Sequence, residues 1–242
     1  DAVVDKLDPG FVNALSARQL SRLVECVLRR ADEGVQAAIG VRVIAGRGQT
    51  ELVCVLEDSL AVLSHVAGVV AAHRMCIDSA SIASMDSAQG PVAMQVFLIR
   101  DEYAQPIPSE DRRWAKVERD LRKVMASESR SELVAELLES RNEGYSVKPK
   151  ITVRDDSEVK IFDAESSDYS VIEVHTGDAI ALLHSVTGVL SRHGLDIHRA
   201  MVSTAGDRVA DAFYAQVDGK KLSAAQGEAL KEDLLRVLAD LT

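Results

Sequence analysis

The sequence predicts an α+β protein that contains two βαββαβ modules in tandem, preceded by a short helical segment. Two observations lead to this fold class: an internal repeat, and the same order of strand and helix patterns in each copy. From Asp58 onward the chain resembles itself 120 positions later without a gap, so that Asp58 aligns with Asp178 and Gly68 with Gly188. An ungapped match that preserves glycines and polarity indicates a duplicated supersecondary unit.

The first copy has the periodicities of a strand, a helix and a hairpin in that order. Residues 51–56 are apolar and β-branched, which is typical of a buried strand. Residues 60–70 carry apolar side chains at three- and four-residue spacing and predict a helix, with Asp58 or Ser59 placed to cap its start. Alternation over 75–85 and an apolar run over 92–99 flank a turn-forming cluster and predict a hairpin. A further helix is expected to open at Pro108.

The second copy repeats this order over residues 169–241. A strand (169–174), a helix (179–192) ended by Gly194, a hairpin (195–203 with 209–217) and a last helix (222–241) follow one another. Ser223 lies near the N-cap of that last helix. Strand-helix-strand-strand-helix is most of a ferredoxin-like βαββαβ unit.

The fourth strand of each module has to come from elsewhere, because a bare sheet edge is a liability. For the first module we expect residues 150–154 to supply it. For the second, either 41–44 or 159–162 is expected, which would cross-connect the modules into one body.

These elements divide the chain into three parts. Residues 1–35 form a helical segment, in which Ser16 caps a helix with an apolar stripe, and we interpret it as the tail of an upstream domain. Residues 36–155 form the first module with a helical connector at 129–141, and residues 156–242 form the second.

Composition excludes several function classes. The net charge of −10 disfavours nucleic acid and anionic membranes as partners, and no apolar run approaches the roughly 20 residues of a membrane span. Three widely spaced cysteines argue against a disulfide framework and fit a reducing cytoplasm. The six histidines follow no metal-ligand pattern, and His73 and His193 are expected at helix C-termini. We therefore expect no metal and no cofactor.

The second copy carries the strings Val171-Ile172-Glu173-Val174 and Gly194-Leu195-Asp196-Ile197-His198-Arg199-Ala200, and then 202–214. This part resembles the last ACT domain of the bifunctional protein-PII uridylyltransferase/uridylyl-removing enzyme family. Residues 149–153 look like the junction between that family's two ACT domains, and 15–32 are similar to the stretch before the first. The resemblance implies a C-terminal regulatory region in which tandem ACT domains sense glutamine and control upstream nucleotidyltransferase and phosphohydrolase domains. This chain carries neither catalytic signature, so we expect no enzyme activity of its own.

The ligand loops depart from the family pattern. ACT modules that bind amino acids typically read Asp-Arg-Pro-Gly-Leu between the first strand and the first helix, where glycine admits the ligand backbone and helix N–H groups bind its carboxylate. Here the acid is present in both copies, but arginine, proline and glycine are absent, and Ala61 and Ala181 place a methyl group near the ligand. The corresponding candidate ligand-binding residues are Asp58, Ser59, Leu60 and Ala61, and Asp178, Ala179, Ile180 and Ala181.

Three functions follow from these observations. The first is a regulatory tandem ACT region that binds a small amino acid, which is glutamine in the family. The second is a degenerate scaffold for homodimerisation or protein–protein interaction without a ligand, in which Asp58 and Asp178 merely cap helices. The third, catalysis by this chain, lacks any nucleophile–base pair, phosphate loop or paired carboxylates at a useful spacing.

Overall fold

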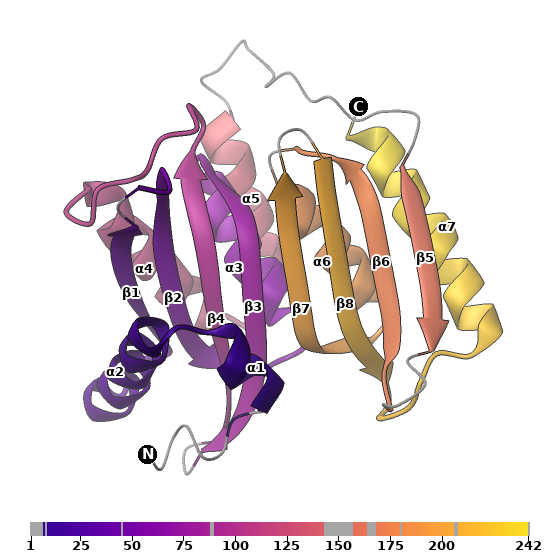
Figure 1. Cartoon of the computed structure of the whole chain (residues 1–242), viewed down its shortest axis with the longest axis horizontal. Helices are drawn as coiled ribbons and strands as arrows, with labels where there is room; N and C mark the ends of the chain where they lie inside the picture. Colours follow the sequence, from indigo (N-terminus) through magenta and orange to yellow (C-terminus); the bar gives the residue numbers. More distant parts are fainter. Residues whose placement is uncertain are drawn as a thin grey trace.

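One antiparallel sheet of eight strands runs through the described part of the chain in the order β1-β2-β4-β3-β7-β8-β6-β5 (Figure 1). The computed structural model describes residues 7, 9–44, 46–87, 90–142, 157–163, 168–179, 181–205 and 208–241. The first half of the sheet contains β1 (Ala37–Ile44), β2 (Gln49–Glu57), β3 (Met75–Ser87) and β4 (Gly90–Asp101). The second half contains β5 (Glu158–Asp163), β6 (Ser170–Gly177), β7 (Leu195–Ala205) and β8 (Arg208–Val217). The predicted α+β class is confirmed, and the two halves are compatible with tandem ferredoxin-like modules.

In the sequence, the edge strand of each half precedes the other strands of that half instead of following them. Residues 41–44 lie in β1, which pairs with β2, so the first half takes its own edge strand from this segment. Residues 159–162 lie in β5 and complete the second half, as one of the two alternatives predicted. The expected cross-connection by strand exchange is therefore wrong for these two segments, while residues 150–154 lie outside the described residues. In each half the edge strand pairs with the strand that follows it in the sequence. Closing the short loop of such a hairpin costs less chain entropy than bringing in a strand from beyond a helix.

The two halves are nevertheless one body, because their inner strands pair. β3 lies antiparallel to β7, with Ser79 opposite Ser203, Ala80 opposite Val202 and Ser81 opposite Met201. Ser81 and Met201 are 120 positions apart, so this pair lies on the pseudo-twofold axis that relates the repeats.

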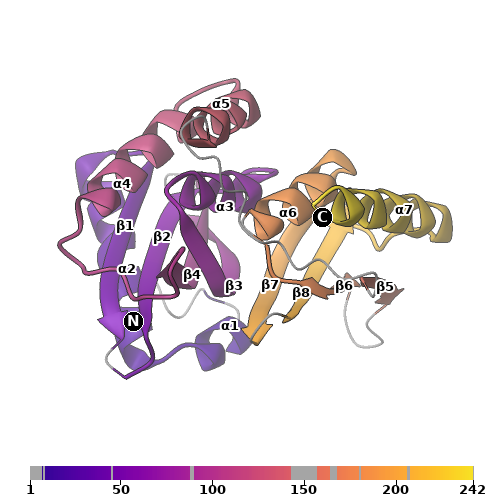
Figure 2. The same ribbon diagram turned by 90° about the horizontal axis from the view of Figure 1, so that it is seen from above.

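Helices α3 to α7 cover one face of the sheet (Figure 2). α3 and α6 lie side by side over the junction, α4 and α5 lie over the first half, and α7 lies over β5. Beneath them a single apolar core continues across both halves and includes Phe97 and Phe213, which are fully buried. The bounds are α3 (Val62–Ala72), α4 (Arg112–Met125), α5 (Arg130–Asn142), α6 (Leu182–Arg192) and α7 (Ala224–Asp240).

Within the described part of the chain, the opposite face is covered only in the first half, by α1 (Pro9–Ala14) and α2 (Ala17–Glu33). The predicted cap of α2 is confirmed, since Ser16 and Gln19 form a capping box. The repeat explains the asymmetry. Val53 and Val55 belong to the apolar cluster under α2, whereas their equivalents 120 positions later are Glu173 and His175, which are partly exposed.

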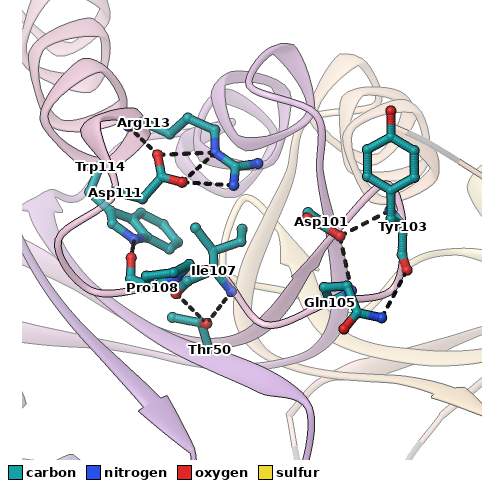
Figure 3. Close-up of polar contacts among 9 residues, drawn as sticks. All are labelled: Thr50, Asp101, Tyr103, Gln105, Ile107, Pro108, Asp111, Arg113 and Trp114. Carbon is teal, nitrogen blue, oxygen red and sulfur yellow. Dashed lines mark hydrogen bonds and ion pairs between the residues drawn. The ribbon is translucent and has the colours of Figure 1, made fainter.

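The β4–α4 connection is ordered by its own hydrogen bonds (Figure 3). The buried Thr50 hydroxyl accepts from the Ile107 N–H at 2.8 Å and donates to the Ile107 carbonyl at 2.7 Å. Asp111 caps α4 by accepting from the Arg113 N–H, so this helix begins at Arg112 rather than at Pro108 as predicted. Proline sets a turn here, and its carbonyl accepts from the Trp114 indole N–H at 2.8 Å.

Candidate functional site

The described residues of the two strand-to-helix loops, 58–61 and 178, 179 and 181, share two features of backbone geometry. Ala61 and Ala181 are in the left-handed region, with φ of 68° and 63°, and each is the N-cap of the helix that follows. Val62 N–H donates to the Ser59 carbonyl at 3.1 Å, and Leu182 N–H donates to the Ala179 carbonyl at 3.2 Å. These alanines occupy the positions where the family pattern has glycine, and a left-handed alanine is strained where glycine is not.

The helices begin later than the sequence predicts. Neither N-cap has a side-chain capping bond, so the expectation that Asp58, Ser59 or Asp178 caps a helix is wrong. The turn at 58–61 and its equivalent place these side chains outside the first helical turn, where they contact the sheet and α5 instead.

Each loop faces the opposite half of the molecule across a small cavity. The first cavity, of about 30 Å³, is lined by the 178–181 loop together with Met75, Cys76 and Ile77 of β3. The second, of about 20 Å³, is lined by the 58–61 loop together with Leu195, Asp196 and Ile197 of β7. The β3 and β7 residues are equivalent in the repeat, so the two cavities are related by the same pseudo-twofold axis.

Asp178 is held by a cation from the other half. Arg100 on β4 donates to Asp178 at 2.9 Å and to Asp78 at 2.5 Å, and Gln49 also donates to Asp78 at 2.6 Å. Burial raises the pKa of Asp178, and the nearby Arg100 guanidinium partly offsets this effect. Asp78 lies at a β-bulge, between Ile77 and Ser79, and bulges commonly re-aim side chains next to sites.

Asp58 has a different environment. Burial raises the pKa of its carboxyl, and a hydrogen bond from Ser84 on β3 counteracts this shift. Ser59 accepts from Arg130 on α5 at 2.8 Å, which ties its loop to the helical layer. Leu60 is 53% exposed and points away from the core, while Ile180 lies outside the described residues. The structure thus brings Asp58, Ser59, Leu60 and Ala61 around one cavity and Asp178, Ala179 and Ala181 around the other.

The sequence reasoning missed two buried polar residues on the sheet under the helices. Asp211 on β8 lines the first cavity and is 2% exposed. Gln95 on β4 is the structural equivalent of Asp211. Gln95 pairs with Cys54, and Asp211 pairs with Val174, which is the residue 120 positions after Cys54. A polar residue at a core-facing position of an alternating strand, as in Val209, Asp211 and Phe213, is the signal that would have found them.

The histidines contribute to structure. His73 and His193 are the C-caps of α3 and α6, as predicted, and their Nε2 atoms lie 2.9 Å from Asp120 and 2.8 Å from Asp233. Among the described residues, no group of three or more His, Cys, Asp or Glu side chains is arranged to hold a metal ion. In the same part of the chain, no helix combines the length and apolarity needed to cross a membrane.

Comparison with known proteins gives one consistent result. The chain is 27% identical over 240 residues to the bifunctional uridylyltransferase/uridylyl-removing enzyme of Azospirillum brasilense, which covers 96% of this chain and 24% of the relative. It is 30% identical over 213 residues to the enzyme of the same name from Bradyrhizobium sp., covering 86% of this chain and 22% of the relative. The match from Rhodospirillum rubrum is 29% identical over 201 residues, 81% of this chain and 20% of the relative. The chain thus spans a quarter or less of the length of these relatives.

Neither family models nor solved structures give a likeness that bears on function. No family model matches the chain. A double ringed trimeric shell protein from the RMM microcompartment aligns over 82% of this chain and 87% of its own at a TM-score of 0.30 and 8% identity. A structure described as an unknown protein from Galdieria sulphuraria aligns over 78% of this chain and 90% of its own at a TM-score of 0.24 and 16% identity. Sequence over most of its length therefore identifies the chain as a divergent relative of one part of the bifunctional uridylyltransferase/uridylyl-removing enzymes.

Proposed function

We propose that this chain is the C-terminal regulatory region of a uridylyltransferase-like protein, with ACT modules at 36–155 and 156–242 that bind a small amino acid, glutamine by analogy with the family. The observation that carries the proposal is the pair of equivalent cavities between the halves. In this proposal the ligand controls nucleotidyltransferase and phosphohydrolase domains that lie outside the chain.

The position of the cavities provides a route for the signal. Each is walled by a loop of one half and the start of an inner strand of the other half, so a ligand there contacts both halves at once. Ligands of drug size occupy pockets of roughly 300–1,000 Å³, while these cavities measure about 30 and 20 Å³. An amino acid therefore enters only if a loop moves away from the strand opposite. A ligand that binds the opened form more tightly shifts the equilibrium toward it, which is the requirement for regulation.

The chemistry of the loops suits an amino acid. Asp58 and Asp178 provide a carboxylate on each side, and α3 and α6 direct their N-terminal N–H groups toward the loops. A helix N-terminus favours the negative carboxylate of a ligand, and a side-chain carboxylate favours its ammonium group.

Calorimetric titration of the whole chain with L-glutamine tests the proposal, with D-glutamine as the matched control. Heat from the L isomer alone, together with a rise in melting temperature, is the expected result. Asp58→Ala and Asp178→Ala each remove one site and are expected to lower the stoichiometry. The absence of both heat and a thermal shift at millimolar L-glutamine contradicts amino-acid sensing.

A second function is favoured by the small volume of the cavities and by the alanines in place of glycine. In this alternative the chain is a degenerate scaffold that dimerises or binds a partner without a ligand. The sheet face that α1 and α2 leave open carries the exposed side chains Phe162 (45%) and Met201 (42%). This alternative predicts a homodimer in light scattering whose melting temperature does not respond to amino acids, and a monomer at every concentration contradicts dimerisation.

A further inference from the structure

Asp211 differs from the other buried carboxylates of the described residues in having no cationic partner. Glu51 lies within 3.5 Å of Arg22 and 3.1 Å of Arg42, Asp78 binds Arg100, and Asp120 binds His73 and Arg119. Asp211 accepts through Oδ1 from the Ser203 N–H at a long 3.4 Å, and its buried Oδ2 has no hydrogen-bond donor among the described residues. A buried polar atom without a partner is costly and indicates a water, an ion or a ligand.

The place of Asp211 favours a ligand group. Its side chain lines the cavity beside the 178–181 loop, where about 30 Å³ accommodates a group of the size of water or ammonium. The charged and titratable groups that face this cavity do not neutralise it. Arg100 is engaged by Asp78 and Asp178, and the His184 Nδ1 is engaged by the Ser64 carbonyl at 2.8 Å. Cys76, on β3, adds a thiol but no cation.

Electrostatics of the site agree with this geometry. Burial raises the pKa of Asp211 to about 8; the hydrogen bond from the Ser203 N–H opposes this rise, and the nearby Asp178 carboxylate adds to it. At neutral pH the group is thus mostly protonated in the ligand-free protein. A cation that enters the cavity favours the ionised form and lowers this pKa.

The equivalent position in the other half has no carboxyl group. Gln95 is fully buried, and neither its Oε1 nor its Nε2 has a hydrogen-bond partner among the described residues. Gln95 is not among the residues that line the second cavity, and the acids there, Asp58 and Asp196, come from the 58–61 loop and β7. The repeat has therefore produced two cavities of unequal chemistry.

We infer that the cavity lined by Asp211 is a site for an ammonium group, with Asp211 Oδ2 as the acceptor, and that the other half has no counterpart of this buried acceptor. The nitrogen belongs either to the free ammonium ion or to a small amino acid. The amino-acid case rests on the proposed function, whereas the ammonium case does not.

A carboxyl titration tests the site itself. The ¹³C shift of the Asp211 carboxyl, assigned by its absence in Asp211→Asn, is followed against pH in sodium, ammonium, methylammonium and tetramethylammonium chloride of equal ionic strength. Ammonium and methylammonium are expected to lower the titration midpoint by at least one pH unit, and the bulkier tetramethylammonium is not. The same midpoint in all four salts overturns the inference and assigns the cavity to water.

A pair of ligands separates this inference from the proposed function. L-Glutamine is compared with 4-carbamoylbutanoate, which lacks only the α-amino group, by calorimetry on the whole chain. Asp211→Asn is expected to weaken glutamine at least tenfold at one site and to leave 4-carbamoylbutanoate unchanged, while the control Gln95→Met leaves both within twofold. Equal glutamine affinity in Asp211→Asn overturns the inference and keeps the proposed function.

The reverse result is also informative. If glutamine fails to bind the native chain while ammonium lowers the Asp211 midpoint, the amino-acid function falls and the ammonium site stands. Asp211→Glu, which keeps the charge, is the second variant and restores glutamine binding if Asp211→Asn folds poorly. Circular dichroism of each variant verifies the fold.

Discussion

Ser64 and His184 occupy the same position in the two repeats, and they hydrogen-bond to each other where α3 meets α6. His184 Nδ1 donates to the Ser64 carbonyl at 2.8 Å, since a carbonyl oxygen only accepts, and the Ser64 hydroxyl donates to the His184 carbonyl at 3.2 Å. Burial lowers the pKa of His184, which keeps the imidazole neutral at pH 7. Two equivalent residues in mutual contact place the pseudo-twofold axis between these helices.

The glycines one turn further along these helices are predicted to respond in opposite ways to alanine. A Cβ at Gly68 would lie 2.3 Å from Val134 Cγ1 and 2.8 Å from His184 Nδ1, so Gly68→Ala overpacks the contact and costs about 1–3 kcal/mol. A Cβ at Gly188 meets Ser64 Oγ at 3.5 Å, an ordinary contact, so Gly188→Ala gains roughly 0.5–1 kcal/mol of helix propensity. Urea unfolding measures both, and a shift of the same sign contradicts the packing.

The left-handed alanines at the loop ends are predicted to be suboptimal for stability. Ala61→Gly and Ala181→Gly each remove the clash of Cβ with the backbone at φ of 68° and 63°, which is worth about 1 kcal/mol. Ala229→Gly, in the exposed interior of α7, is the matched control and loses about 1 kcal/mol. Thermal unfolding that shows a loss for all three variants excludes the left-handed geometry.

The protein is predicted to lose stability in mild acid because of His65. Burial, together with Arg130 and His184, lowers the pKa of His65 from 6.5 to about 4. As pH falls, the imidazole of His65 is therefore protonated in the unfolded chain before it is protonated in the folded protein. The contribution of neutral His65 to the free energy of unfolding is complete above pH 6.5 and is lost between pH 6.5 and 4. His65→Gln keeps a partner for Ser131, which lies 3.1 Å from His65 Nε2, and loses less melting temperature between pH 7 and 4.5. An equal loss in both proteins refutes the assignment.

Asp211 is predicted to act with the opposite sign. Its pKa is about 8 in the folded protein and 3.8 as the ordinary value, so the unfolded chain releases the proton first as pH rises. The contribution of this bound proton to the free energy of unfolding is complete below pH 3.8 and is lost by pH 8. Asp211→Asn has no proton to release, so its stability relative to the native chain increases from pH 5 to pH 8. Urea midpoints at the two pH values measure it, and a constant difference contradicts the buried, unpaired state.

The repeat, the helix layer and most strands could be predicted from sequence because periodicity records which side of an element faces the core. The partner of a strand could not, since residues 41–44 and 159–162 have strand patterns that carry no information on which edge they join. Helix starts were misplaced for a related reason. Aspartate and serine are the preferred caps, whereas an alanine in a left-handed conformation leaves no mark in the sequence.

The candidate site was located but not understood from sequence. The family pattern indicated both loops, yet the contact of Arg100 with Asp178 joins residues 78 positions apart in different halves. No local spacing rule predicts such a pair. The same holds for the cavity that brings Asp211 and Cys76 together, because it depends on how β3 and β7 join.

The pairing of β3 with β7 also removes a constraint on later sequence change. An isologous dimer of a single module has identical halves, so every substitution appears in both sites at once. Fusion of the two modules into one sheet keeps the shape of such a dimer while each copy is free to mutate alone. Gln95 and Asp211 illustrate that freedom: the same buried position carries an amide in one half and a carboxyl group in the other.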